Sequence, residues 1–286
     1  NHLHFNDIPL MDIIKQYGTP LKITYLPKIG SQIEKAKRMF KVAMAKADYK
    51  GSYTYCYCTK SSHFNFVLEE VLKNDVHIET SSAFDIPILR DLYKKGLINK
   101  EMTLVCNGYK RENYQKVVTY LANEGFNVIP ILDHKGEIDY YKKNVKQKTK
   151  IGIRIASEEE PSFEFYTSRL GIRYKEIVDF YKEKIQNDPK LELKMLHFFI
   201  NTGIKDTTYY WSELTKCINV YCDLKKMCPS LDSLDIGGGF PIRTSLSFNY
   251  DYAYMADEII QKIKNICEER EVDEPHIFTE FGSFTV

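Results

Sequence analysis

The sequence has no run of about 18 apolar residues, and Asn1 to Leu10 lack the basic-then-apolar pattern of a secretion signal. This excludes a membrane-spanning helix. Neither sign of charge is in excess, because 40 Lys and Arg nearly balance 39 Asp and Glu and leave a net charge of +1. We therefore expect no nucleic-acid or membrane partner. With only 14 Gly and 10 Pro among 286 residues, extensive disorder is not expected either.

Cysteine is present in an odd number, and close ligand spacing is confined to Cys56 and Cys58. A structural zinc site needs about four converging ligands, so we expect no metal. The simplest interpretation is seven free thiols in a reducing cytoplasm. The cysteines are Cys56, Cys58, Cys106, Cys217, Cys222, Cys228 and Cys267.

From residue 53 onward, short β-branched or aromatic runs alternate with longer amphipathic stretches. The predicted strands are Tyr53–Thr59, Val76–Thr80, Met102–Cys106, Asn127–Leu132, Lys150–Ile155, Leu191–Ile200, Ser233–Gly237 and His276–Glu280. The predicted helices between them include Phe64–Leu72, Ala83–Lys94, Glu112–Ala122, Tyr209–Met227 and Tyr252–Glu269. This alternation favours an α/β fold, a TIM-like (β/α)8 barrel over residues 53–286, with a doubly wound open sheet as the alternative.

Residues 1–52 precede this repeat and carry a possible strand at Leu21–Leu26 and a helix near Gln32–Ala45. The chain stops at Val286, directly after the eighth predicted strand, where a closed barrel should continue into an eighth helix. We therefore expect a further region beyond this barrel.

Candidate functional residues follow the predicted strands, at the end of the barrel where such folds work. Lys60 could point into the barrel mouth, where desolvation would lower the pKa of its amine for Schiff-base chemistry, or it could be a solvated lysine. Gly237, Gly238 and Gly239 would let backbone N–H groups approach a phosphate, or form a flexible turn. Glu280, followed by Gly282, could face the mouth or the solvent.

Three further candidates lie within predicted strands. His197 and Phe199 alternate, so they should share one face of their strand, and a single histidine there is more often a hydrogen-bonded core residue. Arg154 lies in an apolar strand, so we expect it to pair with a buried acceptor or to line a site.

The lysine after the first strand, the three glycines after the seventh and the Glu-x-Gly after the eighth occur together with three further segments: Glu79–Asp85, Val105–Lys110 and Ser168–Ile172. In this order they resemble the fold-type III pyridoxal-phosphate decarboxylases of basic amino acids, which have an alanine-racemase-type barrel. Val105–Lys110 is most similar to the Cys-Asn-Gly-Tyr-Lys segment of biosynthetic arginine decarboxylases.

The resemblance implies that pyridoxal 5'-phosphate is the cofactor and that Lys60 binds it covalently. Glu280 would pair with the ring nitrogen, which makes the ring an electron sink. Arg154 would lie near the ring, and His197 would belong to the family's His-x-His strand. The glycines 237–239 and the Gly282 amide would hold the phosphate.

Three positions depart from the family pattern. Phe199 stands where the family has the histidine that stacks on the ring, although a phenyl ring can also stack. Thr202 lies in a segment only loosely similar to the family's Gly-Ser-Gln. Ser283 replaces a phosphate-binding arginine and keeps only a hydroxyl donor.

The resemblance further implies a C-terminal β-domain missing from this chain, joined by part of residues 1–52, and a homodimer with shared active sites. The leading hypothesis is decarboxylation of L-arginine to agmatine and CO2 in polyamine biosynthesis. Diaminopimelate decarboxylase of lysine biosynthesis, ornithine decarboxylase and carboxynorspermidine decarboxylase are alternatives. A hypothesis of another class is a catalytically silent homologue that binds a regulatory partner. A metal-dependent barrel hydrolase is disfavoured, because the seven histidines do not cluster.

Overall fold

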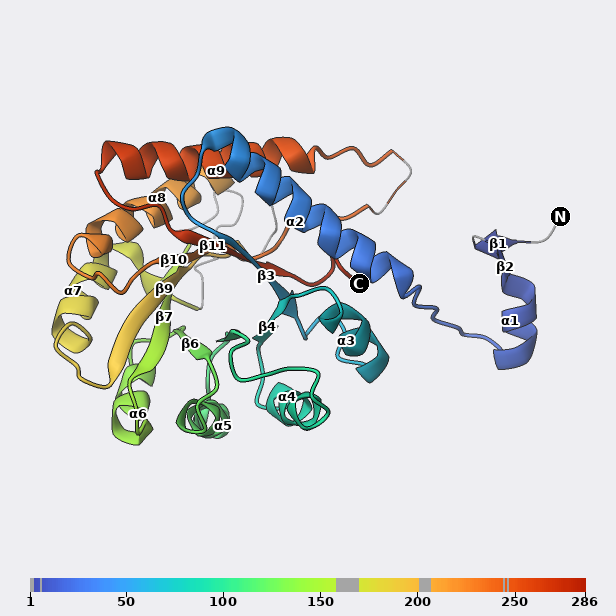
Figure 1. Ribbon diagram of the computed structural model, residues 1–286, viewed down its shortest axis with the longest axis horizontal. Coiled ribbons are helices and arrows are strands. Elements are labelled where there is room, and N and C mark those ends of the chain that lie inside the picture. The colour runs from blue at the N-terminus through green and yellow to red at the C-terminus, as the bar shows by residue number, and fades with distance from the viewer. Residues whose placement is uncertain (1–2, 6, 158–169, 201–206, 244, 246) are drawn as a thin grey trace, which may run out of the picture.

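The computed structural model describes residues 3–5, 7–157, 170–200, 207–243, 245 and 247–286. At its centre, eight parallel strands pair in chain order, and the eighth pairs with the first (Figure 1). The strands are β3 (Tyr53–Cys58), β4 (His77–Thr80), β5 (Leu104–Cys106), β6 (Val128–Leu132), β7 (Thr149–Ala156), β9 (Leu191–His197), β10 (Ser233–Asp235) and β11 (His276–Phe281). This closed sheet confirms the predicted (β/α)8 barrel, and the open-sheet alternative is wrong.

Helices connect successive strands around the outside of the barrel (Figure 1). They are α3 (Asn65–Leu72), α4 (Asp85–Lys94), α5 (Glu112–Asn123), α6 (Glu137–Asn144), α7 (Tyr174–Lys184), α8 (Thr207–Lys225) and α9 (Tyr252–Glu269). A short strand, β8 (Ile172–Arg173), pairs with β7 ahead of α7. In α9, Ile259 and Ile263 are buried one turn apart, and the Asp251 side chain accepts the Tyr254 N–H at 2.9 Å as the N-cap.

The place expected for an eighth helix is taken by α2 (Pro27–Ala47), which contacts both α9 and α3 (Figure 1). Its apolar residues Ile29, Ile33, Phe40 and Met44 recur at helical spacing and are buried. The helix begins at Pro27, earlier than predicted, because proline fits the first turn, where its missing N–H has no partner to lose. The chain segment before the first strand therefore closes the ring of helices.

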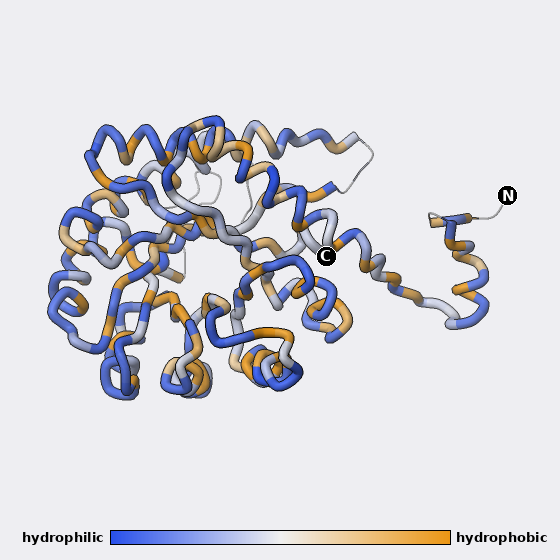
Figure 2. The backbone as a smooth tube through the Cα atoms, viewed as in Figure 1, coloured by the Kyte–Doolittle hydropathy of each residue, from blue (hydrophilic) through white to orange (hydrophobic). Residues whose placement is uncertain are grey.

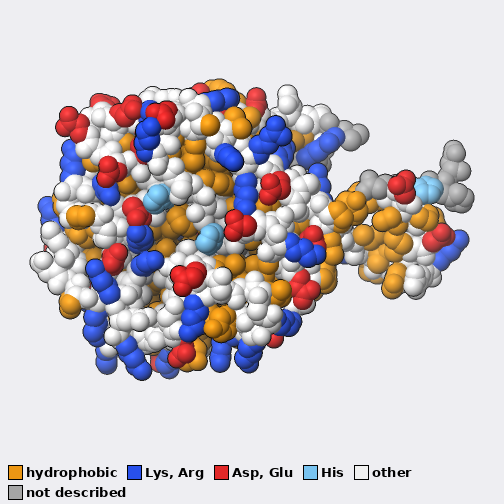
Figure 3. Space-filling view, in the orientation of Figure 1, with side chains coloured by type: hydrophobic (Ala, Val, Ile, Leu, Met, Phe, Trp, Pro, Cys, Tyr) orange, Lys and Arg blue, Asp and Glu red, His pale blue; other side chains and the backbone are white. Residues whose placement is uncertain are grey.

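The predicted strand at Leu21–Leu26 is wrong. Residues 21–25 have no regular structure, and Leu26 is the N-cap of α2. A strand needs a hydrogen-bonded neighbour, and this segment pairs with none in the described part of the chain. The residues before it form the hairpin of β1 (His4–Phe5) and β2 (Ile8–Pro9) and helix α1 (Leu10–Tyr17). This N-terminal arm projects from the barrel, and much of its surface is hydrophobic (Figures 2 and 3).

The sixth barrel strand is shorter than predicted. It ends at His197, because its neighbour β10 ends at Asp235, directly opposite. Phe199 therefore lies outside the strand, and the expectation that it shares a strand face with His197 is wrong.

All seven cysteines are free, as predicted from their number and spacing, and all are buried. A small apolar cluster includes Cys56, Val105, Ile129 and Met195, while in a larger one helices pack against strands.

Across the described ranges, no helix combines the length and hydrophobicity needed to cross a membrane.

Candidate active site at the carboxyl ends of the barrel strands

Lys60 lies in the turn that follows β3, at the carboxyl end of the barrel. Its Nζ is 3.4 Å from Oε2 of Glu79, which is fully buried near the end of β4. Half of the lysine side chain remains exposed (55%), so the amine is both paired and accessible. The opposite oxygen of Glu79 accepts hydrogen bonds from Ser81 Oγ at 2.6 Å and Asn107 Nδ2 at 3.1 Å.

Burial lowers the pKa of Lys60, as predicted from the sequence, but Glu79, Cys58 and Glu280 together, Glu79 most of all, outweigh this effect. The net effect raises the pKa of this amine. The expectation of a lowered pKa is therefore wrong for the structure described, because the sequence did not place Glu79 beside the lysine. Any reaction of the amine requires that its proton first be transferred away.

Glu280, near the end of β11, is buried. The side-chain amide of Asn107 connects it to Glu79, because Asn107 Nδ2 is within hydrogen-bond distance of both carboxylates. Asn107 Nδ2 donates to Glu280 Oε1 at 2.5 Å, and His197 Nε2 lies 3.3 Å from Glu280 Oε2. Burial raises the pKa of Glu280, but His197, Lys60 and Asn107 together outweigh it and bring the pKa to about 2. Glu280 is therefore an anion across the physiological pH range.

The glycines after β10 and β11 lie where side chains do not fit. A Cβ on Gly238 would be 2.2 Å from the Glu280 carbonyl oxygen, and one on Gly282 would be 3.0 Å from Ser61 Cβ. Gly237 and Gly239 have φ of +66° and +84°, a conformation that favours glycine. The Gly237 N–H already donates to Asp235 Oδ1 at 2.8 Å, so the candidates for binding an anion are the amides of Gly238 and Gly239.

Arg154 is buried and has the acceptor that its position predicts: its Nη1 lies 3.4 Å from Asp133 Oδ1. Its guanidinium carbon is 5.6 Å from the ring centroid of Phe199, a cation–π distance. Asp133 also lies 3.5 Å from Nζ of the fully buried Lys110, which pairs with Glu137 at 3.3 Å. Arg154 and Phe199 are thus held together beside the site.

Residues 30–286 match the family model described as "Pyridoxal-dependent decarboxylase, pyridoxal binding domain". The chain belongs to this family. Among curated relatives, biosynthetic arginine decarboxylase from Geobacter sp. (strain M21) is 24% identical over 96% of this chain and 46% of its own length. The same enzyme from Prochlorococcus marinus (strain MIT 9215) is 26% identical over 94% of this chain and 44% of its own. The chain spans about half the length of these relatives.

Solved structures support the fold. Biosynthetic arginine decarboxylase from Campylobacter jejuni has a TM-score of 0.77 at 23% identity, and the match covers 99% of this chain and 49% of that one. Diaminopimelate decarboxylase from M. jannaschii, in complex with L-lysine, has a TM-score of 0.85 at 14% identity, covering 100% and 65%. At these identities the likeness shows the barrel, and the substrate must be argued separately.

The residues at the carboxyl end of the barrel fit the pyridoxal phosphate of this family. An accessible amine, a buried carboxylate with a lowered pKa and a glycine cradle that excludes side chains lie on neighbouring loops and strands. Asn107 Oδ1 and His197 Nδ1 are buried and have no hydrogen-bond partner within the described ranges, so polar atoms remain for a ligand.

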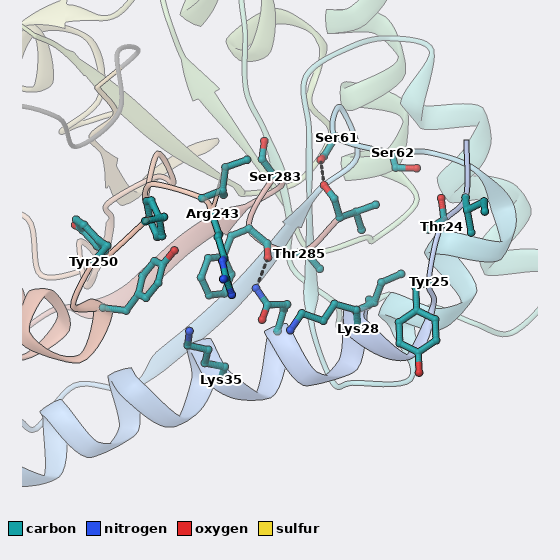
Figure 4. Close-up of a pocket in the computed structure, with 18 of the residues that line it drawn as sticks. Thr24, Tyr25, Lys28, Lys35, Ser61, Ser62, Arg243, Tyr250, Ser283 and Thr285 are labelled. Carbon is teal, nitrogen blue, oxygen red and sulfur yellow. Dashed lines mark hydrogen bonds between the residues drawn. The ribbon is translucent and has the colours of Figure 1, made fainter. Parts of the chain in front are cut away.

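The loops where the sequence predicts phosphate binding are less complete. Ser283 is exposed and lines a cavity of about 700 Å³ between α2, the loop after β10 and the end of the chain (Figure 4). Figure 4 shows Arg243 extending from that loop toward α2, with Lys28 and Lys35 on the helix. These three cations and Lys22 line the cavity, and none of its described lining residues is acidic. Thr202, with residues 168 and 169 of another predicted motif, lies outside the described residues.

Three functional candidates were not singled out from the sequence: Glu79, Asn107 and Asp235. The first two lie inside segments that carried the family resemblance, and all three stand at or next to the end of a barrel strand. A rule that examines every polar side chain at these positions would have found them.

Proposed function

We propose that the protein containing this chain decarboxylates a basic amino acid, most directly L-arginine to agmatine and CO2, with pyridoxal phosphate bound through Lys60. The proposal is carried by one observation: an accessible lysine amine stands 3.4 Å from one buried carboxylate, and a single amide links that carboxylate to a second buried carboxylate, that of Glu280. Family membership and the two arginine decarboxylase relatives support it.

Pyridoxal phosphate, when bound, supplies an electron sink for the carbanion left by departing CO2. The residues of this chain hold and move protons around it. Glu79 Oε2 is the nearby acceptor for the Lys60 proton, and burial followed by the charge of Glu280 raises the pKa of Glu79, which suits it to that task. Glu280, held ionised by His197 and Asn107, would keep the ring nitrogen protonated.

We propose arginine rather than another basic amino acid as the substrate for two reasons. The segment Val105–Lys110 resembles that of arginine decarboxylases, and the curated relatives carry that name. Diaminopimelate, lysine, ornithine and carboxynorspermidine are the competing substrates. A polyamine-producing, cytoplasmic enzyme would agree with seven reduced thiols.

We further propose a homodimer with shared active sites and a second domain that covers the N-terminal arm. The arm supports this, because Leu3, Phe5, Met11 and Tyr17 are at least 42% exposed. An apolar surface of this kind is commonly an interaction surface.

The test uses the complete protein supplied with pyridoxal phosphate and measures CO2 release from arginine, ornithine, lysine and diaminopimelate in parallel. Release from arginine at the highest kcat/KM is expected, and Lys60→Ala should abolish it. Lys95→Ala is the matched control, since Lys95 is paired with Asp91 on α4. Full activity of Lys60→Ala would end the assignment.

The second candidate is a catalytically silent homologue, favoured by Phe199 and Ser283 at two cofactor-binding positions. It predicts cofactor binding without CO2 release from any of these substrates or from carboxynorspermidine. Retention of Lys60, Glu280 and the three glycines favours the enzyme.

A further inference from the structure

Asp235, the last residue of β10, is completely buried and has only one of its two oxygens satisfied. Oδ1 accepts the N–H of Gly237 at 2.8 Å. Oδ2 is buried and has no hydrogen-bond partner among the described residues. An ionised carboxylate with a bare oxygen is a costly group to bury, whereas a carboxylic acid needs only an acceptor for its proton.

An acceptor lies beside it. Asp235 stands opposite His197 on β9 and Phe278 on β11 in the strand register, and one side-chain N or O atom from each of His197, Asp235 and Glu280 lies within 4.8 Å of the others. Two buried carboxyl groups this close do not both ionise, because the repulsion between them is strong in a dry environment. Glu280 is the one with the donors His197 and Asn107, so it holds the charge.

The charge balance around Asp235 points the same way. Lys60 pairs with Glu79, His197 is within hydrogen-bond distance of Glu280, and no ion pair to Asp235 is found in the described part of the chain. The titratable groups that face it are His197 from β9, Glu280 from β11, Glu79 from β4, Tyr53 and Cys56 from β3, and Cys217 from α8. Burial first, and then the charge of Glu280, raise the pKa of Asp235 well above its usual value, and the charge of Glu79 adds to this.

We propose that Asp235 is a neutral carboxylic acid at pH 7, and that it donates its proton to Glu280 and so acts as a positioning residue for that carboxylate. Glu280 then accepts from three side chains, His197, Asn107 and Asp235, while the same Asp235 fixes the Gly237 turn. The assignment deepens the proposed function, on which its relevance to the cofactor rests, but the proton itself can be observed without cofactor or activity.

The first test is infrared spectroscopy of the cofactor-free protein at pH 7 in D2O. We expect a carbonyl band from a protonated carboxylic acid that is lost in Asp235→Asn and kept in the control Glu79→Gln. Absence of the band from wild type, or its loss in Glu79→Gln alone, would overturn the proposal. If Asp235→Asn does not fold, wild type labelled with ¹³C at the aspartate carboxyl carbon replaces it: the band must shift, and an unshifted band overturns the assignment.

The second test compares the pH dependence of folding in wild type and Asp235→Asn. A raised native pKa means that the unfolded chain releases the Asp235 proton first, near pH 4, so wild type loses stability as the pH rises toward the native pKa. The unfolding equilibrium constant of wild type should increase relative to Asp235→Asn by up to about tenfold per pH unit in that window. A ratio that is flat or changes in the opposite direction contradicts the proposal.

A third measurement connects the proton to the site. Asp235→Asn keeps a donor and should bind pyridoxal phosphate within about threefold of wild type, whereas Asp235→Ala should bind at least tenfold more weakly. Equal binding by the two variants would show that the donor is not used. If the acid band is observed but the protein decarboxylates no substrate, the proposed function is wrong and the assignment of the proton to Asp235 still holds.

Discussion

The two ends of the candidate cofactor site are built differently. The proposed ring-nitrogen end consists of buried side chains at the ends of strands, where Glu280 is hydrogen-bonded to Asn107 and lies within hydrogen-bond distance of His197. The proposed phosphate end consists of glycine loops and the exposed Ser283, next to an open basic cavity. Charges in the first region interact strongly because water is excluded, whereas charges in the second are screened. Substitution is therefore expensive at one end and tolerated at the other.

The largest expected effect breaks the ring-nitrogen end. Glu280→Gln keeps the size of the side chain and removes its charge, so kcat should fall by about 10²–10³-fold. The measurement is CO2 release from the preferred substrate together with the visible spectrum of the bound cofactor. A loss below threefold would show that the charge of Glu280 is not used.

The ionised carboxylate of Glu280 should also contribute to the free energy of unfolding. The native pKa of Glu280 is lowered to about 2, below its unfolded value, so ionised Glu280 stabilises the fold above pH 4.5, and this contribution is lost as the pH falls toward 2. A shift of this size corresponds to about 3 kcal/mol.

Urea unfolding of wild type and Glu280→Gln at pH 6, 4.5 and 3.5 measures it. The difference between their unfolding free energies should hold from pH 6 to 4.5 and shrink at 3.5. A difference that grows on acidification contradicts this account.

At the phosphate end, adding the missing charge should strengthen binding. Ser283→Arg places a guanidinium where the family has one and should tighten pyridoxal phosphate binding by about tenfold, the value of a charge-assisted hydrogen bond. Ser283→Gln adds length without charge and is the control. Equal affinities of the two variants would mean that another cation already binds the phosphate.

The smallest expected effect concerns that other cation. We propose that Arg243, which lines the cavity with Ser283, attracts the phosphate from a distance. Arg243→Ala should weaken binding by about two- to fivefold at low salt and less at high salt, as for exposed charges. Arg38→Ala is the matched control, since Arg38 is an exposed arginine of α2 outside the lining of that cavity. An effect independent of salt would contradict a screened interaction.

The sequence predicted the parts of the fold that depend on local pattern. The strand expected at Tyr53–Thr59 is found at Tyr53–Cys58, and the helix Tyr252–Glu269 is found as predicted. It failed where a neighbour decides the structure. Leu21–Leu26 has the composition of a strand but no pairing partner in the described chain, and Phe199 falls outside β9 because β10 is short.

The site was predicted in the same uneven way. Lys60 lies at the barrel mouth, as expected, and Arg154 has a buried acceptor. The direction of the Lys60 pKa was wrong, since it depends on Glu79, a residue from another strand that packing brings within 3.4 Å. Roles at a barrel mouth arise from side chains far apart in sequence, which periodicity does not connect.

The central claim is that Lys60 is the residue that binds pyridoxal phosphate covalently. The direct measurement is reduction of the cofactor-loaded complete protein with borohydride, followed by peptide mass spectrometry. We predict loss of the visible band and a single modified lysine, Lys60. Modification spread over exposed lysines, or located at another lysine while Lys60 stays unmodified, would contradict the account.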